Sequence, residues 1–172
     1  MSPPQDPRPP EETPTLHEPR THAELDRLWS DPKGLWGQLT AVQNDKIGTR
    51  LMLTGFFFLL LGGSFDSVVM RLQLAIPENS LVSPQLYNEL FTNHGTVTMF
   101  LVILPIFEGF AILVLPFMLG SREMPFPRMG AFGFWTLLFG GLLYYSSTLF
   151  AAVPDAGWFA YTPLSGPEFS PD

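Results

Sequence analysis

Asn93-His94-Gly95-Thr96-Val97-Thr98-Met99-Phe100 decides the fold, because it places an imidazole at the start of a long apolar run. The 27 residues from His94 to Gly120 contain one formal charge, Glu108. A bilayer core needs roughly 20 such residues in a helix. An ionisable side chain in that setting is costly and marks a functional site, and neutral imidazole is the commonest metal ligand. The simpler interpretation is a histidine that is hydrogen-bonded across a helix interface.

The composition separates this chain from several protein classes. Its 172 residues are 46% hydrophobic, and 16 acidic against nine basic residues give a net charge of −7. No basic patch is present to neutralise phosphates, so nucleic acid is not expected as a partner. The absence of cysteine excludes disulfides, Cys-ligated zinc and iron–sulfur clusters. Residues 1–50 contain no apolar segment of the signal-peptide type, so we expect the membrane helices to direct insertion.

The chain divides into two predicted regions, residues 1–41 and residues 42–172. The first is predicted to be cytoplasmic and largely disordered, because its first 20 residues are rich in proline and acids. A capping box at Thr21-His22-Ala23-Glu24 predicts a short helix that ends at Asp31-Pro32. Trp29 and Trp36 suit either a membrane–water interface or a surface on a partner subunit.

The second region is predicted to be an all-α integral membrane domain with three transmembrane helices, at about residues 48–75, 91–120 and 130–153. Glycines inside these spans are expected to let the helices approach closely. Lys and Arg favour the cytoplasmic side of a membrane, which predicts a cytoplasmic N-terminus and an outer C-terminus. The basic residues on the inner side are Lys33, Lys46, Arg50, Arg122 and Arg128, and the acidic residues on the outer side are Glu78, Glu89, Asp155, Glu168 and Asp172.

An ordered set of short motifs resembles subunit I of the haem–copper terminal oxidases, the family of cytochrome c oxidase. The likeness covers residues 42–172, with the first three helices of the family's twelve-helix bundle. The motifs are Asp45-Lys46-Ile47-Gly48-Thr49, Met70-Arg71-Leu72-Gln73-Leu74, Tyr87-Asn88, Thr92-Asn93-His94-Gly95, Leu115-Pro116-Phe117-Met118-Leu119-Gly120, Phe126-Pro127-Arg128-Met129, Phe134-Trp135 and Gly157-Trp158-Phe159-Ala160-Tyr161-Thr162-Pro163-Leu164.

The resemblance implies a haem site at the outer end of the domain. His94 falls on the family's second-helix histidine, an axial ligand of the low-spin haem iron, and Gly95 is expected to leave room for the macrocycle. Arg71 falls on an arginine near a polar substituent of that haem, or it reaches the interface as an ordinary basic side chain. Trp158 and Tyr161 fall on a loop near the haem propionates, although interfacial anchoring explains them almost as well.

Glu123 falls where the family has an aspartate at the inner mouth of a proton-uptake channel. The alternative is an exposed ion pair with Arg122 or Arg128. A conventional channel is in doubt, because positions that many members fill with asparagine carry apolar or small residues here: Ile112, Gly130 and Ala131. Ser147 and Thr148 remain as polar lining.

Asp66 and Glu108 are carboxylates inside predicted spans. Asp66 matches an aspartate of the quinol site in quinol-oxidising members, but the other three polar positions of that site correspond here to Gly62, Leu86 and Glu89. One match in four favours cytochrome c or an attached copper domain as the electron donor. Glu108 replaces a residue that is commonly glycine, so it is expected to be a structural or protonated carboxyl, with a proton relay as the alternative.

The resemblance implies the N-terminal portion of the catalytic subunit of a proton-pumping oxidase in a bacterial plasma membrane. Its partners would be the lipid bilayer, the remainder of subunit I and the other oxidase subunits. The isolated chain is not expected to be active, because the copper ligands and the second haem belong to the complete subunit; the other two histidines, His17 and His22, lie in the cytoplasmic segment. The rival interpretations are a small non-catalytic membrane protein for assembly or haem handling, and a quinol-oxidising member of the family.

Overall fold

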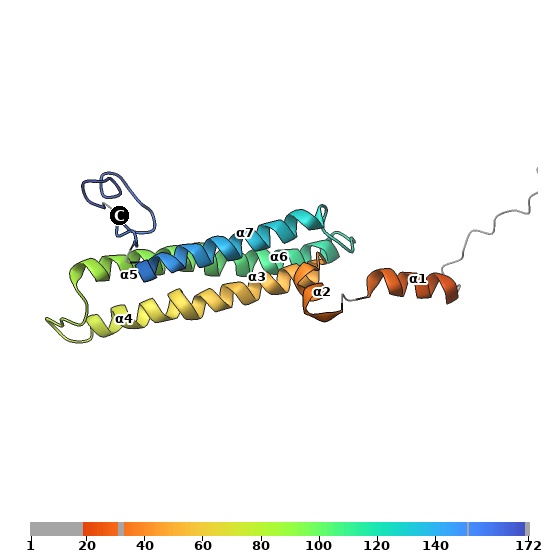
Figure 1. Cartoon of the computed structure of the whole chain (residues 1–172), viewed down its shortest axis with the longest axis horizontal. Helices are drawn as coiled ribbons and strands as arrows, with labels where there is room; N and C mark the ends of the chain where they lie inside the picture. The colour runs from red at the N-terminus through yellow and green to blue at the C-terminus, as the bar shows by residue number, and fades with distance from the viewer. Residues whose placement is uncertain (1–18, 31–32, 151, 171–172) are drawn as a thin grey trace, which may run out of the picture. The chain divides into compact units, whose positions relative to one another are not determined.

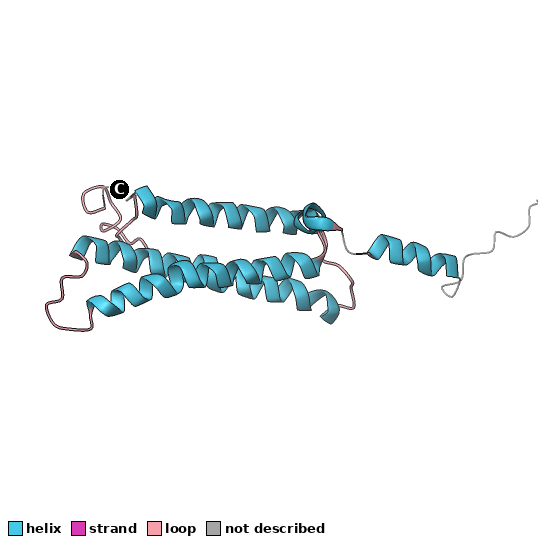
Figure 2. Ribbon diagram, turned by 60° about the horizontal axis from the view of Figure 1, so that its bottom comes forward, coloured by secondary structure: helices cyan, strands magenta, loops and turns pink. Residues whose placement is uncertain are grey.

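The computed structural model describes residues 19–30, 33–150 and 152–170. This part of the chain consists of helices and loops without strands (Figure 2), as predicted for an all-α protein. The predicted disordered tail falls mainly on residues 1–18, which lie outside the described residues. The chain forms two compact units, Met1–Thr40 and Ala41–Asp172.

The first unit contains two short helices, α1 (Pro19–Trp29) and α2 (Gly34–Thr40). Helix α1 is the short helix predicted from the capping box, but it begins at Pro19 rather than at Thr21. Much of the segment predicted to be largely disordered is therefore helical where it is described. In α2, the apolar side chains of Leu35 and Trp36 are exposed, and the Thr40 hydroxyl donates to the Trp36 carbonyl at 2.8 Å.

The second unit is built from three long helical rods that run side by side (Figure 1). A π-helical segment interrupts each of the first two rods. The first rod is α3 (Asn44–Phe58), η1 (Leu59–Ser64) and α4 (Phe65–Gln73), the second is α5 (Pro84–Thr96), η2 (Val97–Ile103) and α6 (Leu104–Met118), and the third is α7 (Pro127–Ser146) followed by the 3₁₀ turn η3 (Ser147–Phe150).

The first two rods are long and apolar enough to cross a membrane. They span Asn44–Gln73 and Pro84–Met118, with 30 and 35 residues, so both begin earlier than the sequence predicted. The third predicted span falls on α7, whose regular α-helix ends at Ser146 rather than near Val153. Its 20 residues correspond to about 30 Å of helix, the thickness of a bilayer core.

Two small apolar clusters fill the space between the rods. Phe58 of α3 packs with Val97 and Leu101 of η2 near the middle of the bundle. Ile47 and Leu51 of α3 pack against Phe134 of α7, which ties the third rod to the first; these two α3 residues are 2% exposed. Most other large apolar side chains are exposed, including Phe107, Phe132 and Leu143. A lipid environment or further helices would cover such surfaces.

Glycines allow the backbones of the first and second rods to come into direct contact. A Cβ atom on Gly48 would lie 2.7 Å from the Gly109 carbonyl oxygen, and one on Gly109 would lie 2.6 Å from that of Gly48. Gly141 of α7 is equally tight against Phe58. The prediction that glycines allow close approach is therefore confirmed at Gly109 and Gly141, whereas Gly140 faces open space.

Candidate functional site

The candidate site lies where α4 crosses α5. Asp66 and Asn93 are both 2% exposed, and the Asn93 amide donates to the Asp66 carboxylate at 2.6 Å. One residue further along each helix, the Ser67 hydroxyl lies 3.2 Å from Nδ1 of His94. Sequence reasoning did not identify Ser67 and Asn93 as partners. The sequence did carry a signal: two adjacent polar residues, Asp66 and Ser67, are followed 27 residues later by another polar pair, Asn93 and His94.

The Ser67 hydroxyl determines which nitrogen of His94 carries the proton. Ser67 Oγ lies 2.6 Å from the Gly63 carbonyl, to which its one proton is donated. Ser67 Oγ is then placed to accept from Nδ1–H of His94, and in a neutral imidazole that tautomer leaves the lone pair on Nε2. A fixed Nδ1–H with a free Nε2 is the form in which an imidazole ligates a metal, so the donor set fits a haem iron.

Trp158 packs against the helical turn that contains His94. A Cβ atom added to Gly95 would lie 2.6 Å from Cδ1 of Trp158, and the Trp158 ring is 6.5 Å from that of Phe100. The expectation that Gly95 leaves room for a macrocycle is therefore not met at this surface, because the indole occupies the space beside Gly95. The segment is held by the Gly157 amide, which donates to the Thr92 hydroxyl at 2.9 Å.

Two other predicted haem contacts lie on the surface. Tyr161 is 70% exposed, and its ring packs 5.0 Å from that of Phe159. Arg71 is exposed and has no hydrogen-bond or ion-pair partner among the described residues. It does not pair with Asp66, which is occupied by Asn93. Among Arg71, Trp158 and Tyr161, which were predicted to lie near the haem, Trp158 packs against the helical turn that contains His94.

A cavity of about 210 Å³ opens beside the buried Asp66–Asn93 pair. Leu86 and Glu89 also line it, so three of the four positions of the quinol-type site meet in one place. Gly62 instead packs against Val97 and Tyr145. Asn93 Oδ1 is buried without a partner among the described residues.

The end of the bundle where α4 meets α5 is called the outer end, and the end where α3 begins and α6 stops is called the inner end, after the predicted orientation. The predicted polar lining in the third span lies at the outer end. Thr148 also lines the cavity beside Asp66, while the Ser147 and Thr148 hydroxyls donate to the carbonyls of Tyr144 and Tyr145 at 2.7 Å. Both residues follow the C-terminal end of α7, whereas Glu123 precedes its N-terminal end. Ser147 and Thr148 therefore lie at the opposite end of α7 from Glu123.

A second cavity, of about 370 Å³, lies at the inner end and brings together Glu108, Ile112 and Gly130. The carboxylate of Glu123 accepts a hydrogen bond from the backbone amide of Asn44 at 3.3 Å, at the N-terminal end of α3. A negative charge is favourable at that end of a helix. The Asn44 side chain also contacts the loop before α7, because its Oδ1 accepts from the Met124 amide at 3.1 Å.

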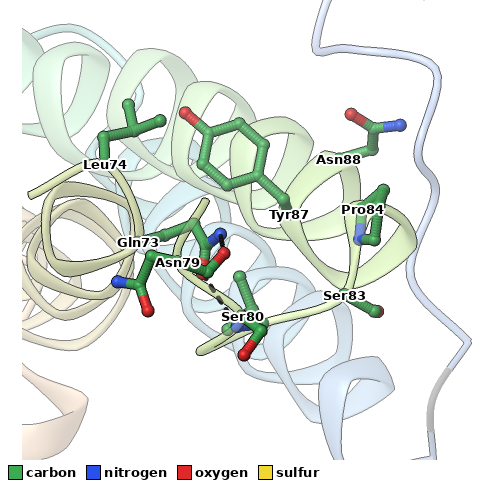
Figure 3. A pocket seen from close by; sticks show the side chains of 9 residues that line it. Gln73, Leu74, Asn79, Ser80, Ser83, Pro84, Tyr87 and Asn88 are labelled. Carbon is green, nitrogen blue, oxygen red and sulfur yellow. Dashed lines mark hydrogen bonds between the residues drawn. The ribbon is translucent and has the colours of Figure 1, made fainter. Parts of the chain in front are cut away.

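The loop between α4 and α5 forms a third cavity, of about 530 Å³ (Figure 3). Its polar groups are largely used to close the loop. The Gln73 amide donates to the Asn79 carbonyl at 2.5 Å and accepts from the Val82 amide at 2.9 Å. Tyr87 and Asn88 line this cavity. The loop connects α4 to α5, the two helices that carry Asp66 and Asn93.

Comparison with known proteins places these motifs in a family. Residues 46–171 match the family described as Cytochrome C and Quinol oxidase polypeptide I. Cytochrome c oxidase subunit 1 of Bacillus subtilis is 41% identical over 131 residues, which cover 76% of this chain and 21% of that protein. The corresponding subunit of Synechocystis is 44% identical over 124 residues, covering 72% of this chain and 22% of that protein.

Quinol oxidase subunit 1 of Bacillus subtilis is 36% identical over 140 residues, which cover 81% of this chain and 21% of that protein. The chain spans about a fifth of the length of the curated relatives it matches. The family match covers both rods that form the His94 crossing, and it confirms the resemblance seen in the sequence motifs. The chain therefore belongs to the subunit I family of cytochrome c and quinol oxidases.

Proposed function

We propose that this chain forms the first three helices of the catalytic subunit I of a proton-pumping haem–copper oxidase, and that His94 binds the low-spin haem iron through Nε2. The observation that carries the proposal is the hydrogen-bond arrangement at Ser67, which donates to Gly63 and leaves Nδ1–H of His94 as the donor to Ser67. The second axial ligand, the oxygen-site haem and copper belong to the remainder of subunit I.

The residues around His94 hold the imidazole in place. The haem, when bound, supplies one-electron transfer. Ser67 fixes the Nδ1 proton, the Asp66–Asn93 pair fixes the crossing of α4 and α5, and Trp158 covers the turn at Gly95. The exposed guanidinium of Arg71 and the phenol of Tyr161 would contact groups outside this chain, among which are the polar substituents of the haem.

The haem proposal is tested by removing the imidazole in the assembled oxidase. His94→Ala should abolish the low-spin haem spectrum while the helices remain inserted. The matched control is His22→Ala, which removes an exposed imidazole in α1 of the first unit and should leave the spectrum unchanged. Wild-type low-spin bands in the His94 variant would refute the assignment.

The rival function, a non-catalytic protein for haem handling, predicts a different result with the chain alone. The purified 172-residue chain supplies a single axial imidazole from its bundle, so it should bind haem weakly. Tight, stoichiometric haem binding by this chain would favour the rival function.

In the membrane, we assign α7 as the third span, residues 1–41 as a cytoplasmic segment and residues 42–172 as a multi-pass domain of a bacterial plasma membrane. The bias of Lys and Arg toward one side supports this orientation. The chain has no cysteine, so single cysteines report topology cleanly. Cysteines that replace Ser80 and Ser165 should react with an impermeant thiol reagent added outside, and one that replaces Ser121 should not. The reverse labelling pattern would overturn the orientation.

For proton uptake, we assign Glu123 to the inner mouth and Glu108 to a deeper position. Glu108 is the acidic residue that lines the inner cavity, together with Ile112 and Gly130, where asparagines of a conventional channel are missing. Proton uptake through this region should therefore depend on Glu108. Glu108→Gln should lower turnover and proton uptake together, and unchanged uptake in this variant would exclude that role. Asp66 is the weaker candidate, because its carboxylate is held by Asn93.

The proposed electron donor is cytochrome c or an attached copper domain. Acidic residues in the outer loops would steer a basic donor, and salt screens such steering over about 10 Å at 0.1 M. Oxygen uptake by the assembled oxidase with reduced cytochrome c should therefore fall steeply as ionic strength rises.

The second candidate donor is a quinol, which the cavity at Asp66, Leu86 and Glu89 favours. Its volume of about 210 Å³ is below the roughly 300 Å³ of a small ligand pocket, and Leu86 offers no polar group to a quinone ring. Turnover with ubiquinol and none with cytochrome c would establish the quinol alternative.

A further inference from the structure

We propose that one face of α5, formed by Gln85, Thr92 and Gly95, is a docking face that positions Trp158 at the turn that carries His94. The three residues are separated by seven and three positions, so they share one side of the helix. The segment that docks on them is residues 153–160, which Figure 1 shows over the α5 end of the bundle. The proposal rests on the proposed function for the role of His94, but its contacts lie within this chain.

Thr92 is the central contact of the docking face. Its hydroxyl is buried, donates to the Asn88 carbonyl at 2.9 Å and accepts from the Gly157 amide at 2.9 Å. A hydroxyl can both donate and accept, so valine, which has nearly the same shape, cannot replace it. Gly157 has φ of +81°, a conformation that side chains rarely adopt, so the segment presents its amide at a position suited to glycine.

Gly95 is the contact nearest His94. A Cβ atom there would lie 2.6 Å from Cδ1 and 3.1 Å from Cβ of Trp158. Rotation of the indole moves Cδ1 but leaves Cβ in place. An alanine at this position must therefore turn the indole and shift Cβ of Trp158 by a few tenths of an ångström.

Gln85 holds the docked segment at the beginning of α5. Its side-chain amide donates to the Asp155 carboxylate at 2.8 Å. The docking face therefore makes hydrogen bonds to the segment through Gln85 and Thr92 and a close-packed contact at Gly95. Asn93 and His94 leave the same turn toward α4, where they meet Asp66 and Ser67. The turn from Thr92 to Gly95 thus holds the imidazole on one side and Trp158 on the other.

Hydrogen exchange at the Gly157 amide in the full chain, held in detergent micelles, tests the Thr92 contact directly. Thr92→Val should accelerate that exchange about five- to tenfold, because one buried hydrogen bond is lost. Thr92→Ser retains the hydroxyl and should preserve the protection. Equal protection in the valine and serine variants would overturn the proposal.

The Gly95 contact is tested by fluorine NMR on chain labelled with 5-fluorotryptophan, in which Trp158→Phe assigns the signal. Gly95→Ala should shift the Trp158 signal. The control Gly133→Ala should leave the signal in place, because nothing lies within 4 Å of a Cβ atom at Gly133. An unchanged Trp158 signal in Gly95→Ala would overturn the proposal.

The link to His94 needs the assembled oxidase. Thr92→Val should shift the electron paramagnetic resonance signal of the low-spin haem without abolishing it, and Thr92→Ser should restore the wild-type signal. A low-spin signal that Thr92→Val leaves unchanged would show that Thr92 does not position the His94 turn. If His94→Ala retained the low-spin haem, the haem assignment would fail, whereas the exchange and fluorine results on the chain would still decide the docking face.

Discussion

The same two helical rods meet in different ways at their outer and inner ends. At the outer end, α4 and α5 are joined by the polar pairs Asp66–Asn93 and Ser67–His94. At the inner end, α3 and α6 approach closely at Gly48 and Gly109, where the nearest side chains are those of Leu51, Met52 and Leu113. Small residues allow the backbones to pack closely at the inner end. At the outer end, the same rods instead bury polar side chains that satisfy one another across the crossing.

The largest expected effect comes from breaking the outer pair on one side. Asn93→Leu leaves the buried Asp66 carboxyl without its amide donor, which should lower the free energy of unfolding by about 3 kcal/mol. The measurement is unfolding by titration with sodium dodecyl sulfate in mixed micelles, followed by helical circular dichroism. The matched control is Asn88→Leu, whose side chain is exposed on the same helix. Equal losses in the two variants would show that the Asp66–Asn93 pair contributes no specific stability at the outer crossing.

A smaller loss is expected at the inner crossing. Gly109→Ala places a Cβ atom against the Gly48 carbonyl, and such overpacking should cost about 2 kcal/mol in the same titration. Gly140→Ala is the control, because it adds the same methyl group in open space and should be neutral or slightly stabilising. A Gly109 variant as stable as the Gly140 variant would mean that the rods do not depend on this close approach.

The smallest effect concerns the docked outer segment and pH. Hydrogen bonds from the side chains of Ser170 and Gln85 lower the pKa of Asp155 below its ordinary value of about 4. A depressed folded-state pKa contributes stability above the unfolded pKa, and that contribution is lost as the pH falls below about 4. The Trp158 fluorine signal should therefore begin to change below about pH 4. The change should be small, because a solvent-accessible carboxylate stabilises the docked segment by only a few tenths of a kcal/mol, on the order of a surface ion pair.

Asp155→Asn provides the control for the pH experiment. The asparagine does not titrate, so its Trp158 signal should not change in the same pH window. Identical pH curves for the wild-type chain and the variant would show that Asp155 does not hold the segment.

The all-α class and the family could be predicted from the sequence, because long apolar runs and ordered motifs are local signals. The partners of His94 and Asp66 were not predicted, because Ser67 and Asn93 become neighbours through the alignment of two helices 27 residues apart in the chain. The contact between Gly95 and Trp158 also depends on a distant segment.

The third span was predicted to continue to about residue 153, whereas α7 ends at Ser146. The apolar run continues past the true end of α7, so hydropathy alone could not show where the regular helix stops.

The π-helical segment η2 has a consequence for the direction in which the second rod presents its side chains. In a regular α-helix, the fourteen positions from His94 to Glu108 amount to nearly whole turns, within about 40° of the same bearing. A π turn takes up one more residue than an α turn and shifts this angular phase. The π-helical segment Val97–Ile103 therefore changes the angle between side chains before it and side chains after it. As a result, the direction of His94 toward Ser67 does not fix the direction of Glu108 toward the inner cavity.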